Sequence, residues 1–213
     1  MVQLGGHDLT GKNQTLQQLK QAEREARKQM ILAATLKLFG KNQISDVSIR
    51  DIAKEAGISP ALIYRHFNDR DELFVESFML QSRDIIEKFE QAIGQNEQIT
   101  IEEIGKEFIE YLQHNSLFFK MMSYFMLDYT LMAEHLEQFN ETIRELLHVF
   151  DQAFRENGLS ENVRLHSHAF FAALNGIMIT FHHYPGRSEE ESAKHIKQLT
   201  LLISDLFRKG TEQ

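Results

Sequence analysis

The 213-residue sequence predicts an all-α fold, with an amino-terminal helix-turn-helix joined by a long helix to a larger helical part. Apolar residues recur at helical spacing over long segments, and no run shows the sustained alternation of a half-buried strand. Proline, which interrupts helices, occurs only at positions 60 and 185.

The first helix is expected to start between Thr15 and Arg24 and to include the apolar positions of residues 31–39. Ser48 is expected to cap a second helix, because its hydroxyl can accept from the free amides of the first turn. Gly57 follows the last apolar position of that helix, where a left-handed residue ends a helix.

A short helix should follow this turn. Ser59 can cap it, and Pro60 is placed at the first helical position, where its missing amide hydrogen costs nothing. This helix is expected to span about two turns and to end near Phe67. Two short helices joined by a glycine turn form a helix-turn-helix, which places one helix in the major groove of DNA.

The remaining elements are expected to be helical as well. Asn68 or Asp69 can cap a long helix that runs to about Ile93. Thr100 can cap the next helix, which should break near Asn115. A very apolar segment follows over 117–127, and helices are expected over 131–157, 161–183 and 188–209, the last with a Ser-x-x-Glu capping box at residues 188–191.

The composition excludes several classes of protein. The chain has no cysteine, which rules out disulfides and thiolate zinc sites and fits a reducing, cytoplasmic location. No stretch of about 18 apolar residues is present, so no membrane partner is expected. Residues 1–13 lack the charged start and apolar centre of a signal peptide.

The net charge of −8 is unevenly distributed. Residues 1–74 contain 11 Lys or Arg and 9 Asp or Glu, whereas residues 75–213 contain 12 and 22. The acidic charge therefore lies outside the predicted helix-turn-helix. Binding to phosphates needs a local basic surface and not a basic whole chain.

The helix-turn-helix segment resembles the DNA-binding domain of TetR-family transcriptional regulators. The residues that carry the resemblance are Gly57, Ile58, Ser59, Leu62, Ile63, Tyr64, His66, Phe67 and Arg70. Leu62 stands where the family commonly has Thr, so a hydroxyl contact is lost there. Residues 31–39 also look like the first helix of the family, and the resemblance covers about residues 25–75.

The resemblance implies three parts. These are an amino-terminal extension over 1–23, flexible or helical, a DNA-binding domain over 24–74, and an effector-binding and dimerisation domain over 75–213. In the DNA-binding domain, Tyr64, His66 and Arg70 are expected to contact phosphates. The full set of expected DNA contacts is Arg50, Ser59, Pro60, Ala61, Leu62, Tyr64, Arg65, His66 and Arg70.

Other interpretations of these residues remain open. Arg65 could contact guanine O6 and N7 in bidentate fashion, or it could bind a phosphate or stay solvated. Tyr64 and His66 could be ordinary half-buried helix residues. Arg50 could serve a phosphate or remain solvated.

A cluster of aromatic and methionine residues marks the second candidate site. Methionine repacks easily and suits sites for apolar ligands, and the resemblance implies an effector pocket in the carboxy-terminal helices. Plain core packing is the alternative. The candidate effector residues are Phe118, Met121, Met122, Phe125, Met126, Tyr129, Phe150, Phe171, Asn175 and Met178.

The last two helices carry small and apolar residues at helical spacing, which suits a helix-bundle seam. The resemblance implies a two-fold dimer there, and packing inside one subunit is the alternative. The candidate interface residues are Leu165, Ala169, Ala172, Gly176, Ile196, Leu199 and Ile203.

The ten histidines show no spacing that favours a metal site, and no cofactor is expected. The sequence also lacks a nucleophile–base pair, a phosphate-binding glycine loop and paired catalytic acids, so no enzyme is predicted. The favoured function is a homodimeric repressor released from a palindromic duplex DNA operator by a small apolar or aromatic effector. The alternative is a helical protein-interaction module with a non-functional helix-turn-helix.

Overall fold

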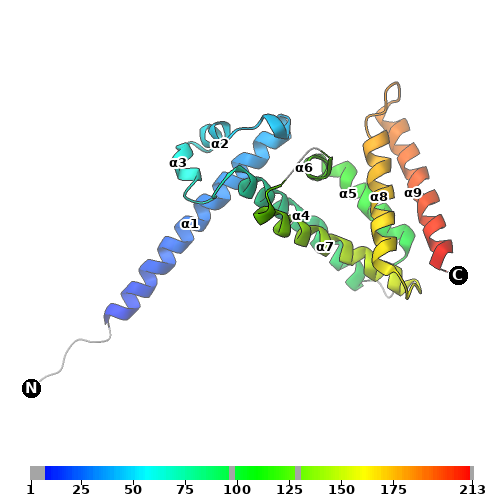
Figure 1. Ribbon diagram of the computed structural model, residues 1–213, viewed down its shortest axis with the longest axis horizontal. Helices are drawn as coiled ribbons and strands as arrows, with labels where there is room; N and C mark the ends of the chain where they lie inside the picture. The colour runs from blue at the N-terminus through cyan, green and yellow to red at the C-terminus, as the bar shows by residue number, and fades with distance from the viewer. Residues whose placement is uncertain (1–7, 96–98, 128–130, 212–213) are drawn as a thin grey trace, which may run out of the picture. The chain divides into compact units, whose positions relative to one another are not determined.

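A computed structural model describes residues 8–95, 99–127 and 131–211, and within these ranges it contains helices and no strand (Figure 1). The all-α prediction is confirmed. The helices in chain order are α1 Asp8–Lys41, the 3-10 helix η1 Ile44–Asp46, α2 Ile49–Ala56, α3 Pro60–Ile63, α4 Arg70–Gln95, α5 Ile101–His114, α6 Ser116–Leu127, α7 Ala133–Glu156, α8 Val163–Phe181 and α9 Glu189–Thr211.

Contacts within the chain define two compact units, with the boundary between Ser77 and Phe78 inside α4. In the first unit, α2 and α3 lie beside the carboxy-terminal half of α1 (Figure 1). Its core contains Ile52 and Ile63, both fully buried, and the rings of Phe39 and Phe74, which meet edge to face at 4.6 Å. This aromatic contact holds the carboxy-terminal part of α1 against the start of α4.

Helix α1 is longer than the sequence analysis predicted, because it begins at Asp8 and not between Thr15 and Arg24. Its first half contains mainly residues of high helix propensity, such as Gln, Leu, Lys, Glu and Ala. An ion pair at i, i+4 spacing between Glu23 and Arg27 adds local support. Residues 16–27 are all exposed, so this half of α1 is held by its own helical structure and not by burial.

The predicted start and stop of α2 are confirmed. Ser48 and Asp51 form a capping box, in which the Ser48 hydroxyl accepts from the Asp51 amide and the Asp51 carboxylate accepts from the Ser48 amide. These hydrogen bonds from Ser48 lower the pKa of Asp51. Gly57 ends the helix at φ 67°, a left-handed conformation that favours glycine.

Helix α3 is shorter than predicted. Regular α-helix covers only Pro60–Ile63, and the chain continues to Phe67 in a turn whose amides bond back to nearby carbonyls. Ser59 occupies the cap position, but its side chain makes no cap hydrogen bond. Asp69 caps α4 instead of Asn68, since its carboxylate accepts from the Glu72 amide at 2.8 Å.

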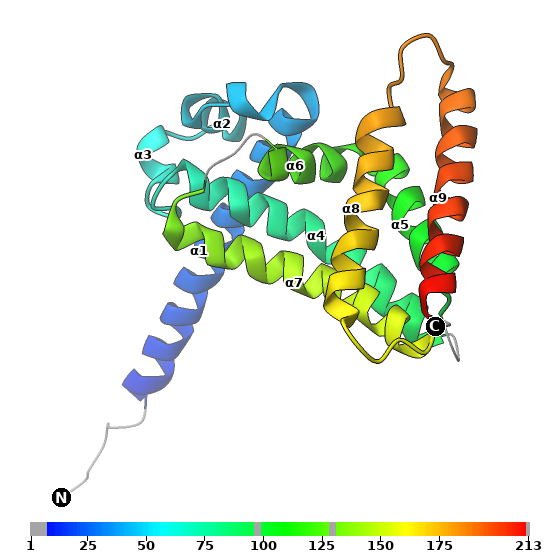
Figure 2. The same ribbon diagram turned by 45° about the vertical axis from the view of Figure 1, so that its right-hand side comes forward.

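The second unit is a helical bundle. Helix α5 packs against α8 and α9, and α7 packs against α8. Helices α8 and α9 run antiparallel side by side in both views (Figure 1, Figure 2). Thr100 caps α5 as predicted, in a capping box with Glu103, and the predicted capping box at Ser188 is also formed. Within the described residues, no helix is both long and apolar enough to span a lipid bilayer.

Candidate nucleic-acid interface

Helix α3 and the turn after it divide cleanly into a buried and an exposed side. Ile63 and Phe67 are buried and anchor the segment in the core of the first unit. Pro60, Ala61 and Arg65 are exposed, and Tyr64 has 54% of its surface exposed. An exposed hydroxyl and guanidinium beside small apolar groups suit a helix that lies in the major groove.

The other predicted DNA contacts differ in their exposure. Ser59 is exposed at the start of α3, and Arg50 is exposed on α2. Leu62 and His66 are half-buried. The structure therefore brings the predicted contacts of α3 together on one short segment.

Arg70 differs from the expectation of a phosphate contact. Its guanidinium donates hydrogen bonds to the backbone carbonyls of Ile44, Ser45 and Val47, at 3.0–3.3 Å. The same group lies 4.3 Å from the centre of the Phe74 ring. Arg70 therefore joins the turn between α1 and α2 to α4, and we assign it a structural role.

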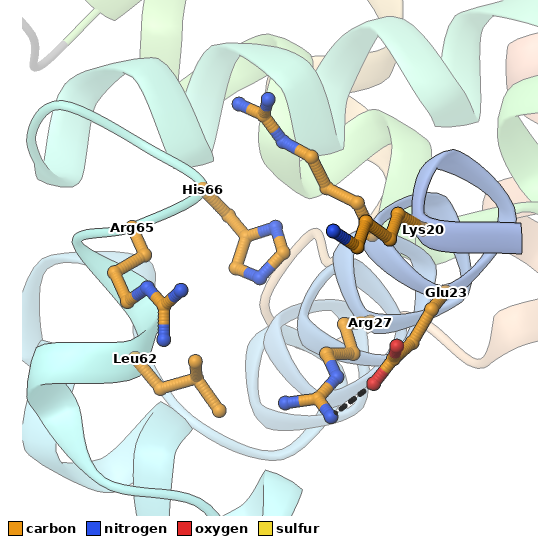
Figure 3. Close-up of a pocket in the computed structure, with 7 residues that line it drawn as sticks. Lys20, Glu23, Arg27, Leu62, Arg65 and His66 are labelled. Carbon is orange, nitrogen blue, oxygen red and sulfur yellow. Dashed lines mark hydrogen bonds and ion pairs between the residues drawn. The ribbon is translucent and has the colours of Figure 1, made fainter. Parts of the chain in front are cut away.

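A cleft of about 460 Å³ lies between α1 and the end of α3 (Figure 3). Its lining consists of Lys20, Glu23, Arg24, Arg27, Leu62, Arg65 and His66. Figure 3 shows the imidazole of His66 between Arg65 on one side and Lys20 and Arg27 on the other. Four cations and one carboxylate border this space, so its electrostatic potential is positive.

His66 occupies an unusual position in this cleft. Its Nδ1 atom is buried and has no hydrogen-bond partner among the described residues. Burial lowers the pKa of His66, and repulsion from Arg24, Arg65, Arg27 and Lys28 lowers it further. Both effects favour the neutral imidazole of His66 in the free protein.

The α1 cations are functional candidates that the sequence analysis missed. Lys20, Arg24 and Arg27 follow i, i+4, i+7 spacing, which places them on one face of a helix. That spacing was visible in the sequence. It could not be interpreted, because nothing in the sequence shows that this face of α1 lies opposite α3.

The predicted effector residues lie mainly in the core of the second unit. Phe118 and Phe125 both contact the Phe78 ring, at 5.7 and 5.5 Å between centroids. Phe150 and Phe171 both contact Phe108. Met121, Met122 and Met178 are buried, whereas Met126 is 39% exposed, and Tyr129 lies outside the described residues.

Asn175 is one of the polar residues buried in this unit. Its amide nitrogen donates to the Phe171 carbonyl at 2.8 Å, and its buried Oδ1 atom has no partner among the described residues. A buried amide oxygen without a donor is costly. It is therefore a place where a bound molecule with a donor group would be stabilised.

The predicted dimer residues divide between surface and core. Leu165, Ala169, Ala172 and Gly176 form an exposed stripe along α8. Ile196 is only 1% exposed, so its assignment to an interface is wrong, because it packs inside the unit.

Leu199 and Ile203 are intermediate in exposure. The exposed apolar residues that the sequence analysis overlooked are Ile179 on α8 and Leu201 and Leu202 on α9. The three- and four-residue spacing does not distinguish the inward side of α9 from its outward side, because both sides carry apolar residues.

Within the described part of the chain, no group of three or more His, Cys, Asp or Glu side chains is placed to hold a metal ion.

Together, the capped α2, the left-handed Gly57 turn and the exposed side of α3 define a helix-turn-helix DNA-binding protein. Residues 31–76 match the model of the bacterial regulatory proteins of the tetR family. This match covers the helix-turn-helix and the end of α1, so the amino-terminal segment is similar to the DNA-binding segment of tetR-family regulators.

Solved structures of similar fold cover most of the chain. The regulator FadR from Bacillus subtilis, in complex with stearoyl-CoA, is 19% identical with a TM-score of 0.66, over 85% of this chain and 98% of that one. A TetR-family regulator described as putative, from Mesorhizobium loti, is 20% identical with a TM-score of 0.63, over 86% and 97%. A transcriptional regulator from Aquifex aeolicus is 23% identical with a TM-score of 0.57, over 83% and 99%. At these identities the similarity shows a shared fold.

Proposed function

We propose that the protein is a homodimeric repressor that binds a palindromic DNA operator and is released by a small apolar or aromatic effector. Residues 24–74 form the DNA-binding domain, and residues 75–213 form the effector-binding and dimerisation domain. The observation that carries the proposal is the exposed side of α3, where Pro60, Ala61, Tyr64 and Arg65 project from a helix-turn-helix fixed by buried Ile63 and Phe67.

Each subunit inserts α3 into one major groove, and a two-fold dimer then requires an inverted repeat. Tyr64 binds a phosphate and so positions the protein without reading sequence. Arg65 reads a base, most simply guanine through O6 and N7. Arg50 supports binding from α2 through a phosphate.

The dimer forms through the exposed apolar residues of α8 and α9. Leu165 is 66% exposed and Leu206 is 56% exposed, which is costly for large aliphatic side chains in water. The small residues Ala169, Ala172 and Gly176 lie between the larger ones on α8 and allow a second helix to approach closely.

The effector binds in the aromatic and methionine core of the second unit. Methionine side chains at Met121, Met122 and Met178 can repack around a ligand. The unpartnered Oδ1 atom of Asn175 supplies one polar contact. Since the similar FadR structure holds stearoyl-CoA, long-chain acyl thioesters are the first class of effector to test.

The proposal is tested by selecting duplexes from a random DNA library with the full-length protein. We expect an inverted-repeat sequence that binds more tightly than a scrambled duplex of the same length at every salt concentration. Arg65→Ala should cost about 1–3 kcal/mol on the selected duplex and relax the preference at one base pair per half-site. Equal affinity of the wild-type protein for selected and scrambled duplexes would refute the regulator function.

The effector is tested on the same duplex. Stearoyl-CoA, stearate and coenzyme A are each titrated into the protein–DNA complex. A ligand changes DNA affinity only to the extent that it prefers one of the two states of the protein. Release by stearoyl-CoA or stearate but not by coenzyme A would support an apolar effector. Release by coenzyme A alone would contradict it.

A further inference from the structure

We propose that the amino-terminal half of α1 is itself a DNA-contacting element, in which Lys20, Arg24 and Arg27 join His66 to bind the backbone phosphates of the duplex that α3 engages. This inference rests on the proposed function, because it assigns an additional site to the same duplex. It concerns residues that the tetR-family match does not cover, since that match begins at residue 31.

Among the described residues, the cations of the cleft have few intramolecular partners. Arg27 pairs with Glu23 at 2.5 Å, and Glu23 is the only carboxylate in the lining. Lys20 and Arg24 make no hydrogen bond or ion pair with another described residue. Like charges at i, i+4 on a helix repel one another. A bound anion would relieve this repulsion.

The chemistry of the lining selects a phosphate group. Guanidinium groups match the oxygen atoms of a phosphate in bidentate fashion, and an ammonium group adds a point charge. The Nδ1 atom of His66, which has no partner, becomes a donor when the imidazole is protonated. Three donor types therefore face one space of about 460 Å³, which is open to solvent and larger than a single phosphate requires.

The position of the cleft favours duplex DNA over a free anion. Arg65 and Leu62 line the cleft and also belong to the α3 segment that carries the proposed DNA contacts. The cleft is therefore continuous with the exposed side of α3. A backbone that passes from the major-groove contacts towards α1 would place its phosphates between Lys20, Arg24 and His66.

Exposure argues against a structural role for these cations. Lys20, Arg24 and Arg27 lie in the fully exposed part of α1. Their truncation removes little packing, so the fold should be unchanged. A loss of DNA binding on truncation would then report the contact itself.

The test uses the full-length protein and the selected duplex. The double variant Lys20→Ala with Arg24→Ala should flatten the plot of log affinity against log salt concentration by about two units for each bound subunit, because each phosphate contact contributes about 0.9. The loss should be equal on selected and scrambled duplexes. Arg83→Ala, an exposed cation in the second unit, serves as the charge control.

A gain-of-binding variant makes the test independent of any folding defect. Glu23→Gln removes the carboxylate of the cleft and frees Arg27, so affinity for both duplexes should rise about threefold at low salt. Glu25→Gln is the matched control, because Glu25 lies on the same exposed stretch but does not line the cleft. An equal effect of both substitutions would overturn the proposal.

The outcomes separate this inference from the proposed function. If the wild-type protein binds the selected duplex but the double variant keeps the wild-type salt slope, only the role of α1 is refuted. If the wild-type protein has no preference for any duplex, the proposed function itself fails. If inorganic phosphate or pyrophosphate at millimolar concentration saturates the cleft while the double variant keeps the wild-type salt slope, the occupant is a free anion and the duplex assignment is overturned.

Discussion

The Nη2 atom of Arg70 donates a hydrogen bond to the backbone carbonyl of Ser45 at 3.0 Å. This contact links the first residue of α4 to η1, about 25 positions earlier in the chain. Further bonds to the carbonyls of Ile44 and Val47 surround it. The turn between α1 and α2 therefore depends on a charged group that belongs to α4.

Arg70→Met should consequently destabilise the first unit without changing the salt dependence of DNA binding. Hydrogen bonds to a charged group contribute about 1.5–3 kcal/mol, and the loss should appear in native-state hydrogen exchange of the amides over 44–52. Arg50→Met, on the exposed surface of α2, should leave exchange unchanged. Normal exchange in Arg70→Met with a salt slope reduced by about one unit for each bound subunit would instead assign Arg70 to a phosphate.

Gly105→Ala should destabilise the second unit. A Cβ atom at this position would lie 2.8 Å from Cζ of Phe170 and 2.9 Å from Oγ of Ser204. The Phe170 ring is fully buried and contacts the rings of Phe150 and Phe154, so it cannot easily move. We expect a loss of about 1–3 kcal/mol from overpacking.

The measurement for Gly105→Ala is thermal unfolding followed by circular dichroism. Gly210→Ala is the control, because a Cβ atom there would meet nothing within 4 Å. The control should be neutral or slightly stabilising, as expected for Gly to Ala in a helix. Equal melting temperatures for the two variants would show that α5, α8 and α9 can separate at low cost.

Gly176→Arg should convert the proposed dimer into monomers. Gly176 is exposed on α8 and its site is open, so the substitution leaves the subunit fold intact and places a charge in the proposed seam. Ala193→Arg is the control, because Ala193 is exposed on α9 about 180° from Leu202. Sedimentation should give monomers for the first and dimers for the second. Dimers in both would place the interface elsewhere.

DNA binding should strengthen as the pH falls, through His66. Burial and the surrounding cations lower its pKa in the free protein below the ordinary value of 6.5, whereas a phosphate beside the imidazole would raise it. Binding therefore takes up a proton. The groups that face His66 are Lys20, Glu23, Arg24, Arg27 and Lys28 of α1, with Arg65 after α3.

The sign of this linkage fixes the pH window. The gain is fully present below the free-state pKa, which lies under 6.5, and it is lost as the pH rises through the higher pKa of the complex. Affinity should change by at most about tenfold per pH unit for each bound subunit, since one proton per subunit is involved. His66→Gln should flatten the dependence of DNA affinity on pH when it is measured from about pH 5.5 to about pH 8. An unchanged profile in this variant would remove His66 from the site.

Met122→Trp should alter the response to effector while leaving effector-free DNA binding intact. Met122 is buried in the core of the second unit, so a larger ring would occupy space that a ligand needs. Met126→Trp is the matched control, since Met126 is substantially exposed on the same helix. DNA release is titrated with stearoyl-CoA. Wild-type release of DNA by stearoyl-CoA in both variants would place the effector site outside this cluster.

The sequence by itself determined the local structure. Ser48, Gly57 and Pro60 each act within a few residues of the backbone, through a cap, a left-handed conformation and a missing amide hydrogen. For that reason the helix-turn-helix and the family resemblance could be predicted from one stretch. The alternation of buried and exposed positions on α3 follows from the same local periodicity.

The tertiary structure decided which groups meet across large distances in the chain. Arg70 has the sequence context of a phosphate contact, but its guanidinium is engaged by carbonyls that lie about 25 positions away. In the sequence, Lys20 and Arg24 cannot be distinguished from ordinary solvated cations. In the structure, α1 places them opposite His66. Ile196 and Leu206 share the same spacing on α9, and only packing buries one and exposes the other. Local propensity cannot determine such pairings, because they depend on how helices pack against one another.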